Sequence, residues 1–212
     1  NGLGHSATTL YDSLCGLPST VSDANGLTTT ISYDGFCRKK EEVYPDGSTL
    51  DYYFAWSDGA DAGLNRDGLV LGDRSTYQLT SQSSLGGWKT VYYDVLGREV
   101  RSKKLGFNNK VVIKDIAYDE QGRIAGETIP YYEGLFAGDA TYWRLTRYDS
   151  LNRVAKILQP TEDNNYIETR VSYDGTTVST HGQDGHLKEE TKDGLGRVVE
   201  VIENSQSIIK YS

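Results

Sequence analysis

Methionine is absent from this chain of 212 residues, and proline and cysteine are scarce, with 4 and 2 copies. So few prolines beside 23 glycines exclude a proline-rich linker and a collagen-like chain. No apolar run is long enough to span a membrane, and no basic-then-apolar secretory segment opens the sequence. We therefore expect no membrane span, and the start at Asn1 favours a piece of a longer protein.

A clustered basic surface is also missing. The chain has 22 Lys and Arg against 30 Asp and Glu, which gives a net charge of −8, and its basic residues are scattered. Binding to nucleic acid depends on concentrated Lys and Arg that neutralise phosphates. The composition therefore predicts no nucleic-acid partner and favours a solvated acidic surface.

Patterns typical of catalysis are absent. The three histidines are His5, His181 and His186, and the spacing of the last two fits no usual zinc site. There is no nucleophile elbow, no cysteine paired with a histidine, and no phosphate-binding loop leading from a strand into a helix. We expect no enzymatic activity, no catalytic residues and no cofactor.

One segment, about residues 57–75, is rich in oxygen ligands and glycine. Asp58, Asp61, Asn65 and Asp67 are weak calcium candidates, but their spacing is not that of an EF-hand and no glutamate closes the loop. A solvated, less regular insertion between strands is the favoured interpretation, and a calcium-stiffened repeat is the alternative.

A short phrase recurs along the chain. It reads "YDVLGREVRS" from Tyr93, "YDEQGRIAGE" from Tyr118 and "YDSLNRVAKI" from Tyr148. Tyr-Asp pairs begin at positions 11, 33, 93, 118, 148 and 173, and the long interval from 33 to 93 has room for two more units, from Tyr44 and from Tyr77. Such a period indicates a structural repeat.

Each phrase has the chemistry of a β-hairpin turn. Apolar residues alternate before the tyrosine, the aspartate can accept bonds from nearby amides, and the glycine can adopt the positive φ of a turn with a bulge. Asn152 and Cys37 take the glycine position in two copies. We expect the arginine to lie over a tyrosine ring or to pair with the aspartate. The repeat residues are Tyr33, Asp34, Arg38, Tyr93, Asp94, Gly97, Arg98, Tyr118, Asp119, Gly122, Arg123, Tyr148, Asp149, Asn152, Arg153, Asp193, Gly196 and Arg197.

The predicted fold is all-β, a single array of consecutive antiparallel hairpins over residues 1–212. A lone hairpin is marginally stable in water, whereas neighbouring hairpins stabilise one another. An array cut from a longer sheet presents edge strands, so we expect an isolated fragment to self-associate.

Cysteines and tryptophans have two open interpretations each. Cys15 and Cys37 follow Tyr11 and Tyr33 at the same distance, which would bring the thiols close if the units are neighbours, but free thiols are favoured because disulfide geometry is demanding.

Trp56, Trp88 and Trp143 either pack between hairpins, which is favoured, or offer faces for stacking on sugars. Glycans are therefore the alternative partner, in a carbohydrate or cell-surface binding module.

The repeated phrase resembles the Rhs/YD-repeat family. The copies that carry the resemblance are "YDGFCR", "YDVLGR", "YDEQGR", "YDSLNR" and "DGLGR", which together cover nearly the whole chain. The stretches "YDSLCGLPSTVSDANGLTTTISYDGFCR" and "YYDVLGREVRSKKLGF" are similar to the repeat region of bacterial toxin-complex B components and SpvB-like proteins.

The resemblance implies a very large, secreted bacterial protein. In that family the hairpins form a twisted, spiralling sheet that closes as a hollow shell around a C-terminal toxin polypeptide. The partners implied are other parts of the same shell and the enclosed polypeptide. The family's self-cleaving core and toxin domain are not visible in this sequence.

Overall fold

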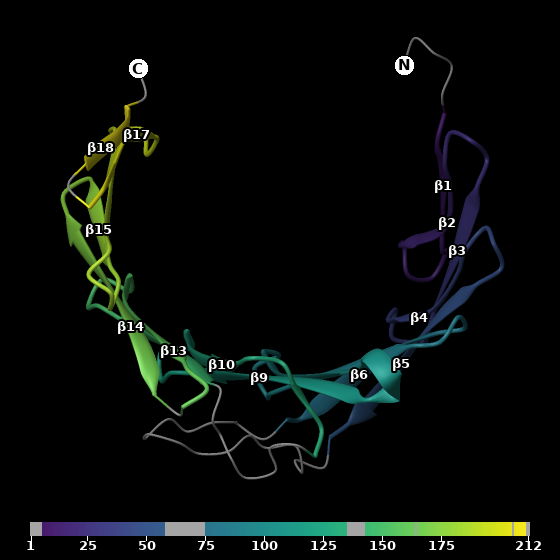
Figure 1. Cartoon of the computed structure of the whole chain (residues 1–212). Helices are drawn as coiled ribbons and strands as arrows, with labels where there is room; N and C mark the ends of the chain where they lie inside the picture. Colours follow the sequence, from purple (N-terminus) through teal and green to yellow (C-terminus); the bar gives the residue numbers. More distant parts are fainter. Residues whose placement is uncertain (1–5, 58–74, 135–142, 164, 205, 211–212) are drawn as a thin grey trace. The chain divides into compact units, whose positions relative to one another are not determined.

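The chain is built almost entirely of β-strands (Figure 1). The structure is a computed structural model that describes residues 6–57, 75–134, 143–163, 165–204 and 206–210. Within these ranges, a three-residue 3-10 turn at Phe107–Asn109 is the one helical element, and no helix has the length and apolar character that a membrane crossing requires. The all-β prediction is confirmed.

The chain divides into two compact units between Ile113 and Lys114. In the first unit each strand is antiparallel to the next one along the chain, from the first to the eighth. Its strands are β1 (Thr8–Tyr11), β2 (Pro18–Ser22), β3 (Thr28–Tyr33), β4 (Lys39–Val43), β5 (Thr49–Trp56), β6 (Tyr77–Ser83), β7 (Trp88–Tyr93) and β8 (Glu99–Leu105).

The second unit repeats the same plan. Strand β9 (Val111–Tyr118) begins in the first unit and continues into the second, where it pairs with β10. Strand β10 pairs directly with β12, and from β12 each strand is antiparallel to its successor. The strands are β10 (Ile124–Thr128), β11 (Tyr131–Tyr132), β12 (Trp143–Tyr148), β13 (Val154–Pro160), β14 (Tyr166–Asp174), β15 (Thr177–His181), β16 (Leu187–Lys192), β17 (Val198–Glu203) and β18 (Gln206–Lys210).

One kind of turn joins many of these strands. In it, the amide of the first residue donates to the carbonyl of the fifth, and the amide of the fourth donates back to the carbonyl of the first. At Asp94 these two bonds are Asp94 N to Arg98 O at 3.0 Å and Gly97 N to Asp94 O at 3.0 Å. The pattern is that of a type I turn followed by a residue of positive φ. It recurs at turns that begin at Asp23, Asp34, Tyr44, Ser83, Asp119, Asp149, Gly182 and Asp193.

The fourth residue of the turn takes the positive φ that the sequence predicts. φ is 77° at Gly97 and 81° at Gly196. The two residues that replace glycine at this position also have a positive φ, 59° at Cys37 and 63° at Asn152. A side chain in this region is strained by its Cβ, which is why glycine dominates and asparagine is the next choice. The turns at Tyr44 and Ser83 have the same bonds but follow β4 and β6, whereas the Tyr-Asp turns of this unit follow β1, β3 and β7. Most of the connection from β5 to β6 lies outside the described residues, so the two further units expected in the long interval stay a prediction.

Chain parity places the Tyr-Asp turns of a unit on one edge of its sheet. Successive turns of an antiparallel meander alternate between the two edges. In the first unit the turns at Asp12, Asp34 and Asp94 follow β1, β3 and β7, and therefore share an edge. In the second unit the same holds for the turns at Asp119, Asp149 and Asp193, after β9, β12 and β16.

Few of the described side chains are fully buried, because the described residues of each unit place no second layer against its sheet. The main apolar cluster of the second unit consists of Ala117, Trp143 and Leu145, with Leu158 and Tyr166 packed against it. Several large apolar turn residues remain exposed, among them Leu14 at 79% and Leu195 at 79%. Globular domains normally bury a sheet face against another layer. In this architecture, contacts between side chains on neighbouring strands provide the stabilisation instead.

The expectation of free thiols is wrong. Cys15 and Cys37 form a disulfide between the first two Tyr-Asp turns, with Cα atoms 5.4 Å apart, and the described residues hold no free cysteine. The first turn has one residue more than the others, since Asp12 N bonds to Leu17 O and Gly16 N bonds to Asp12 O. The shared edge brings the two turns together, which supplies the proximity that spacing alone did not establish.

Replacing the positive-φ glycine of the last turn should destabilise it. Gly196→Ala should cost about 1 kcal/mol, because alanine is strained at this φ although nothing obstructs its Cβ. Gly194→Ala is the matched control, since Gly194 lies in the same turn, has equally open space and lacks the positive φ. Urea unfolding with hydrogen exchange of β16 and β17 would measure both, and equal effects of the two substitutions would contradict the strain argument.

Removing the disulfide should lower stability. The bond joins residues 22 apart, and a loop of that size gives roughly 3 kcal/mol in the chain-entropy account. We expect Cys15→Ser to reduce the midpoint of urea unfolding. Added reductant should shift the midpoint of the original protein but leave that of the Cys15→Ser variant unchanged. Equal midpoints for the two oxidised proteins would show that the bond contributes nothing.

Candidate functional site

The repeated aspartate fixes the inside of each Tyr-Asp turn. In the turn at Asp94, Oδ1 accepts hydrogen bonds from the amides of Leu96 at 2.9 Å and Arg98 at 2.8 Å. The same pair of bonds recurs at Asp34, Asp119, Asp149 and Asp193, at 2.8–3.0 Å. One carboxylate oxygen therefore satisfies two amides that the turn leaves without a main-chain acceptor.

The second carboxylate oxygen binds the arginine that closes the turn. Asp94 Oδ2 accepts from Arg98 Nε at 2.7 Å, and a second guanidinium nitrogen lies 2.6 Å away. Arg38, Arg123, Arg153 and Arg197 repeat the Nε contact with their own turn aspartates at 2.7–2.8 Å. Asp94 is fully buried, with no exposed surface, so its charge is balanced by four donors instead of by water.

The arginine also lies over an aromatic ring, and the ring belongs to the following repeat. The Arg123 guanidinium carbon is 4.3 Å from the centre of the Tyr148 ring, and that of Arg153 is 4.1 Å from the Tyr173 ring. Arg38 contacts Phe54 in the same way at 4.3 Å. The predicted pairing of the arginine with the turn aspartate and its predicted position over a tyrosine ring are both confirmed. The structure adds that the ring belongs to the next repeat, so the cation–π contact links successive repeats.

The tyrosine hydroxyl forms a second contact with the preceding repeat. Tyr148 Oη donates to Ile124 O at 2.8 Å, and Tyr173 Oη donates to Val154 O at 2.9 Å, in each case the residue after the arginine. Tyr33 Oη does the same to Pro18 O at 2.7 Å, across the longer first turn. We call this set of contacts the Asp-Arg-Tyr ladder. In it, an aspartate pairs with the arginine of its own turn, the arginine lies over the tyrosine ring of the next repeat, and the hydroxyl of that tyrosine donates to the carbonyl of the residue after the arginine.

Hydrogen bonds and the paired arginine lower the pKa of four ladder aspartates, Asp34, Asp119, Asp149 and Asp193. The side-chain bond from Arg38 is the main cause that lowers the pKa of Asp34 below its usual range. At Asp149 and Asp193 the amide of the closing arginine is the largest cause of the lowered pKa. At Asp119 burial alone would raise the pKa, but the amide and guanidinium of Arg123 outweigh it.

The structure does not describe the other predicted ligand residues. The weak calcium ligands Asp58, Asp61, Asn65 and Asp67, with His5, lie outside the described residues. Within the described ranges no three His, Cys, Asp or Glu side chains come together as a metal site. The recurrent side-chain arrangement among the described residues is the ladder, whose bonds position strands.

The tryptophans divide between the two interpretations. Trp143 is 4% exposed and packs on Ala117 and Leu145, as the packing interpretation predicts. Trp56 is 72% exposed and makes an edge contact with Phe54 at 5.2 Å. The packing prediction therefore fails for Trp56, which lies at the end of β5 with its ring open to solvent.

Comparisons with known proteins support the fold. No family model and no curated protein matches the sequence. The fold is similar to that of solved structures, among them TcdB2-TccC3, with a TM-score of 0.54 at 12% identity, and TcdB2-TccC3-Cdc42, with 0.53 at 10% identity. Each match covers 95% of this chain but only 14% and 17% of the other, so the chain spans less than a fifth of their length. The predicted resemblance to toxin-complex proteins is confirmed at the level of the fold.

The lowered pKa of Asp34, Asp119, Asp149 and Asp193 predicts acid sensitivity. A carboxyl whose pKa is depressed in the folded state adds stability above its unfolded pKa of about 3.9, and this is lost as the pH falls through the folded value. The melting temperature should therefore drop steeply below about pH 4, and Asp149→Asn should flatten the drop. Asp163→Asn, in an exposed loop outside the ladder, is the control, and an identical profile for both variants would contradict the assignment.

The contact between successive Tyr-Asp repeats can be measured as a coupling energy. A double-mutant cycle of Arg153→Met and Tyr173→Leu should show roughly 0.5–1 kcal/mol of coupling, because the cation–π contact exists only when both are present. A second cycle that pairs Arg153 with Tyr33, in the other unit, should show none. Coupling of the same size in both cycles would mean that the substitutions act on global stability and not on the contact.

Proposed function

We propose that this chain is a structural segment of a toxin-complex protein, forming part of the wall of a hollow shell that encloses a C-terminal toxin polypeptide. The observation that supports this most is the Asp-Arg-Tyr ladder, whose contacts join neighbouring hairpins at Arg123–Tyr148 and at Arg153–Tyr173. Such a device extends a sheet and does no chemistry on a substrate.

The one-layered sheet supports the same proposal. A wall needs breadth and two accessible faces, whereas a globular domain needs a core between layers. The fold shared with TcdB2-TccC3 over nearly the whole chain agrees with a structural role in such an assembly. The partners of the segment are then the adjoining repeats and the enclosed polypeptide, and the protein is secreted.

We propose further that the segment itself has no enzymatic activity. The five ladder aspartates each bind two amides and an arginine, so none of these five is available as a general base: Asp34, Asp94, Asp119, Asp149 and Asp193. A glycoside or ester hydrolase activity in the purified chain would overturn this part.

The shell can be tested with the protein that the complete reading frame encodes. Its C-terminal polypeptide should resist protease while the repeat region is intact, and should become susceptible when Asp94→Ala and Asp119→Ala together break two rungs of the ladder. The free C-terminal polypeptide, expressed alone, is the control for intrinsic susceptibility. Rapid digestion inside the unmodified protein, at the rate of the free polypeptide, would rule the shell out.

A further inference from the structure

The first Tyr-Asp turn lacks the arginine on which the ladder depends. A ladder turn closes with an arginine whose carbonyl accepts from the amide of the turn aspartate. In the first turn Leu17 has this position, because Leu17 O accepts from Asp12 N at 2.8 Å. The first lysine or arginine of the whole sequence is Arg38. Strands β1, β2 and β3 therefore cannot supply a guanidinium to the Asp12 carboxylate or to the Tyr33 ring.

A disulfide takes the place of the missing arginine. Cys15 and Cys37 join the first two Tyr-Asp turns, with Cα atoms 5.4 Å apart. The other ladder contact is kept, since Tyr33 Oη donates at 2.7 Å to Pro18 O, the residue after Leu17. The first two repeats are thus linked by a covalent bond and a hydrogen bond, where later repeats have a cation–π contact and the same hydrogen bond.

Both cysteines depart from the turn pattern at its own expense. Cys15 is the additional residue of the first turn, and without it the sequence from Asp12 would read Asp-Ser-Leu-Gly, as in a ladder turn. Cys37 occupies the fourth position, where its φ of 59° strains the Cβ and glycine is preferred. Two departures that meet in one bond indicate that the bond, and not the turn, determines the choice of these residues.

Backbone pairing does not reach this edge of the sheet. The register between β2 and β3 stops at Thr20 opposite Thr30. Strand β3 continues to Tyr33, whereas β2 begins at Pro18, which has no amide hydrogen to donate. The disulfide and the Tyr33–Pro18 bond therefore hold the start of β2 against the end of β3.

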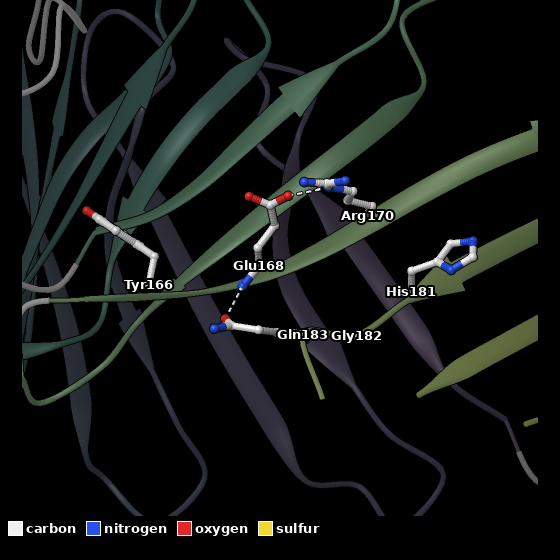
Figure 2. A pocket seen from close by; sticks show the side chains of 6 residues that line it. All are labelled: Tyr166, Glu168, Arg170, His181, Gly182 and Gln183. Atoms are coloured by element: carbon white, nitrogen blue, oxygen red, sulfur yellow. Dashed lines mark hydrogen bonds and ion pairs between the residues drawn. The ribbon is translucent and has the colours of Figure 1, made fainter. Parts of the chain in front are cut away.

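Charged side chains add links between strands elsewhere in the chain. In the second unit Glu168 of β14 pairs with Lys156 of β13, and Figure 2 shows its second pair, with Arg170. Such ion pairs cannot form between β1, β2 and β3, which contain no lysine or arginine. Opening the disulfide should therefore loosen the first hairpin and leave the later strands in place.

The bond is accessible to thiol reagents. Both cysteines are half-buried, and the residue before each is exposed, Leu14 at 79% and Phe36 at 82%. An attacking thiolate forms a mixed disulfide with one sulfur, and the second thiol of a dithiol then displaces that sulfur. In sum, the two cysteine sulfurs gain two electrons and two protons and become thiols, while the dithiol becomes a disulfide.

We propose that the Cys15–Cys37 bond is a redox switch in the ladder. When oxidised it fixes the first hairpin, β1 and β2, against β3, and when a small-molecule or protein dithiol reduces it, the hairpin is released. Disulfides persist in oxidising compartments and are reduced where dithiols are abundant. A chain that passes from one compartment to the other would change at this hairpin while its later repeats stay intact. This inference does not depend on the shell proposed above.

Hydrogen exchange of the oxidised and the reduced chain, without denaturant, tests the switch. We expect dithiothreitol to raise the exchange rates of the first turn and of β2 by about tenfold or more, and to leave β7, β8 and β12 to β17 within about twofold. Unchanged exchange in β2 would show that the bond fixes nothing. A rise across the whole sheet, or a need for urea before the bond is reduced, would identify a staple of the global fold. Each of these results would overturn the proposal.

A variant with a standard ladder turn tests whether the bond replaces an arginine. Deletion of Cys15 with Leu17→Arg and Cys37→Gly gives both turns the ladder sequence. We expect this variant to exchange as slowly as the oxidised protein, with or without dithiothreitol, because the new guanidinium can bind Asp12 and the Tyr33 ring. The matched control has the deletion and Cys37→Gly but keeps Leu17, and should exchange fast in both conditions. Fast exchange with the arginine, or slow exchange in the control, would overturn the proposal.

Discussion

A single aspartate carboxylate carries the most consequential interaction in this structure. One oxygen completes the hydrogen bonding of a tight turn, and the other holds an arginine whose far side lies on the next unit's aromatic ring. Local turn formation and contact between units thus depend on the same group. A carboxylate that satisfies two amides and one guanidinium is well paired even where it is fully buried, as at Asp94.

This dependence explains how a sheet without a second layer can persist. A conventional domain is stabilised by apolar burial between layers, which is largely missing within each unit. Here the contacts run along the sheet, from one hairpin to its neighbour, through stacked cations, tyrosine hydroxyls and a local apolar cluster. Each unit is then completed by the next one, as in other repeat proteins with nearest-neighbour stabilisation.

Much of the fold could be predicted because turn chemistry is local. A five-residue stretch is enough to recognise which position must accept the hydrogen bonds of the turn, as at Asp94, and which must adopt a positive φ, as at Gly97 and Asn152. The Cys15–Cys37 bond could not be predicted with the same force, since it depends on which turns lie on one edge and on an extra residue in the first turn. A row of basic residues across β12, β13, β14 and β15 could not be predicted for a similar reason. Arg147, Lys156, Arg170 and His181 are far apart in sequence, and only strand register brings them into one row.

The parity of the meander constrains how such a chain can change in length. The ladder contacts of Arg123 and Arg153 require successive Tyr-Asp turns to lie on the same edge, so that the arginine reaches the next tyrosine ring. Inserting or deleting a pair of strands preserves this arrangement, whereas a single strand would move all later turns to the opposite edge. Duplication and loss of repeats should therefore occur in whole hairpins, and related chains should differ in length by multiples of a two-strand unit.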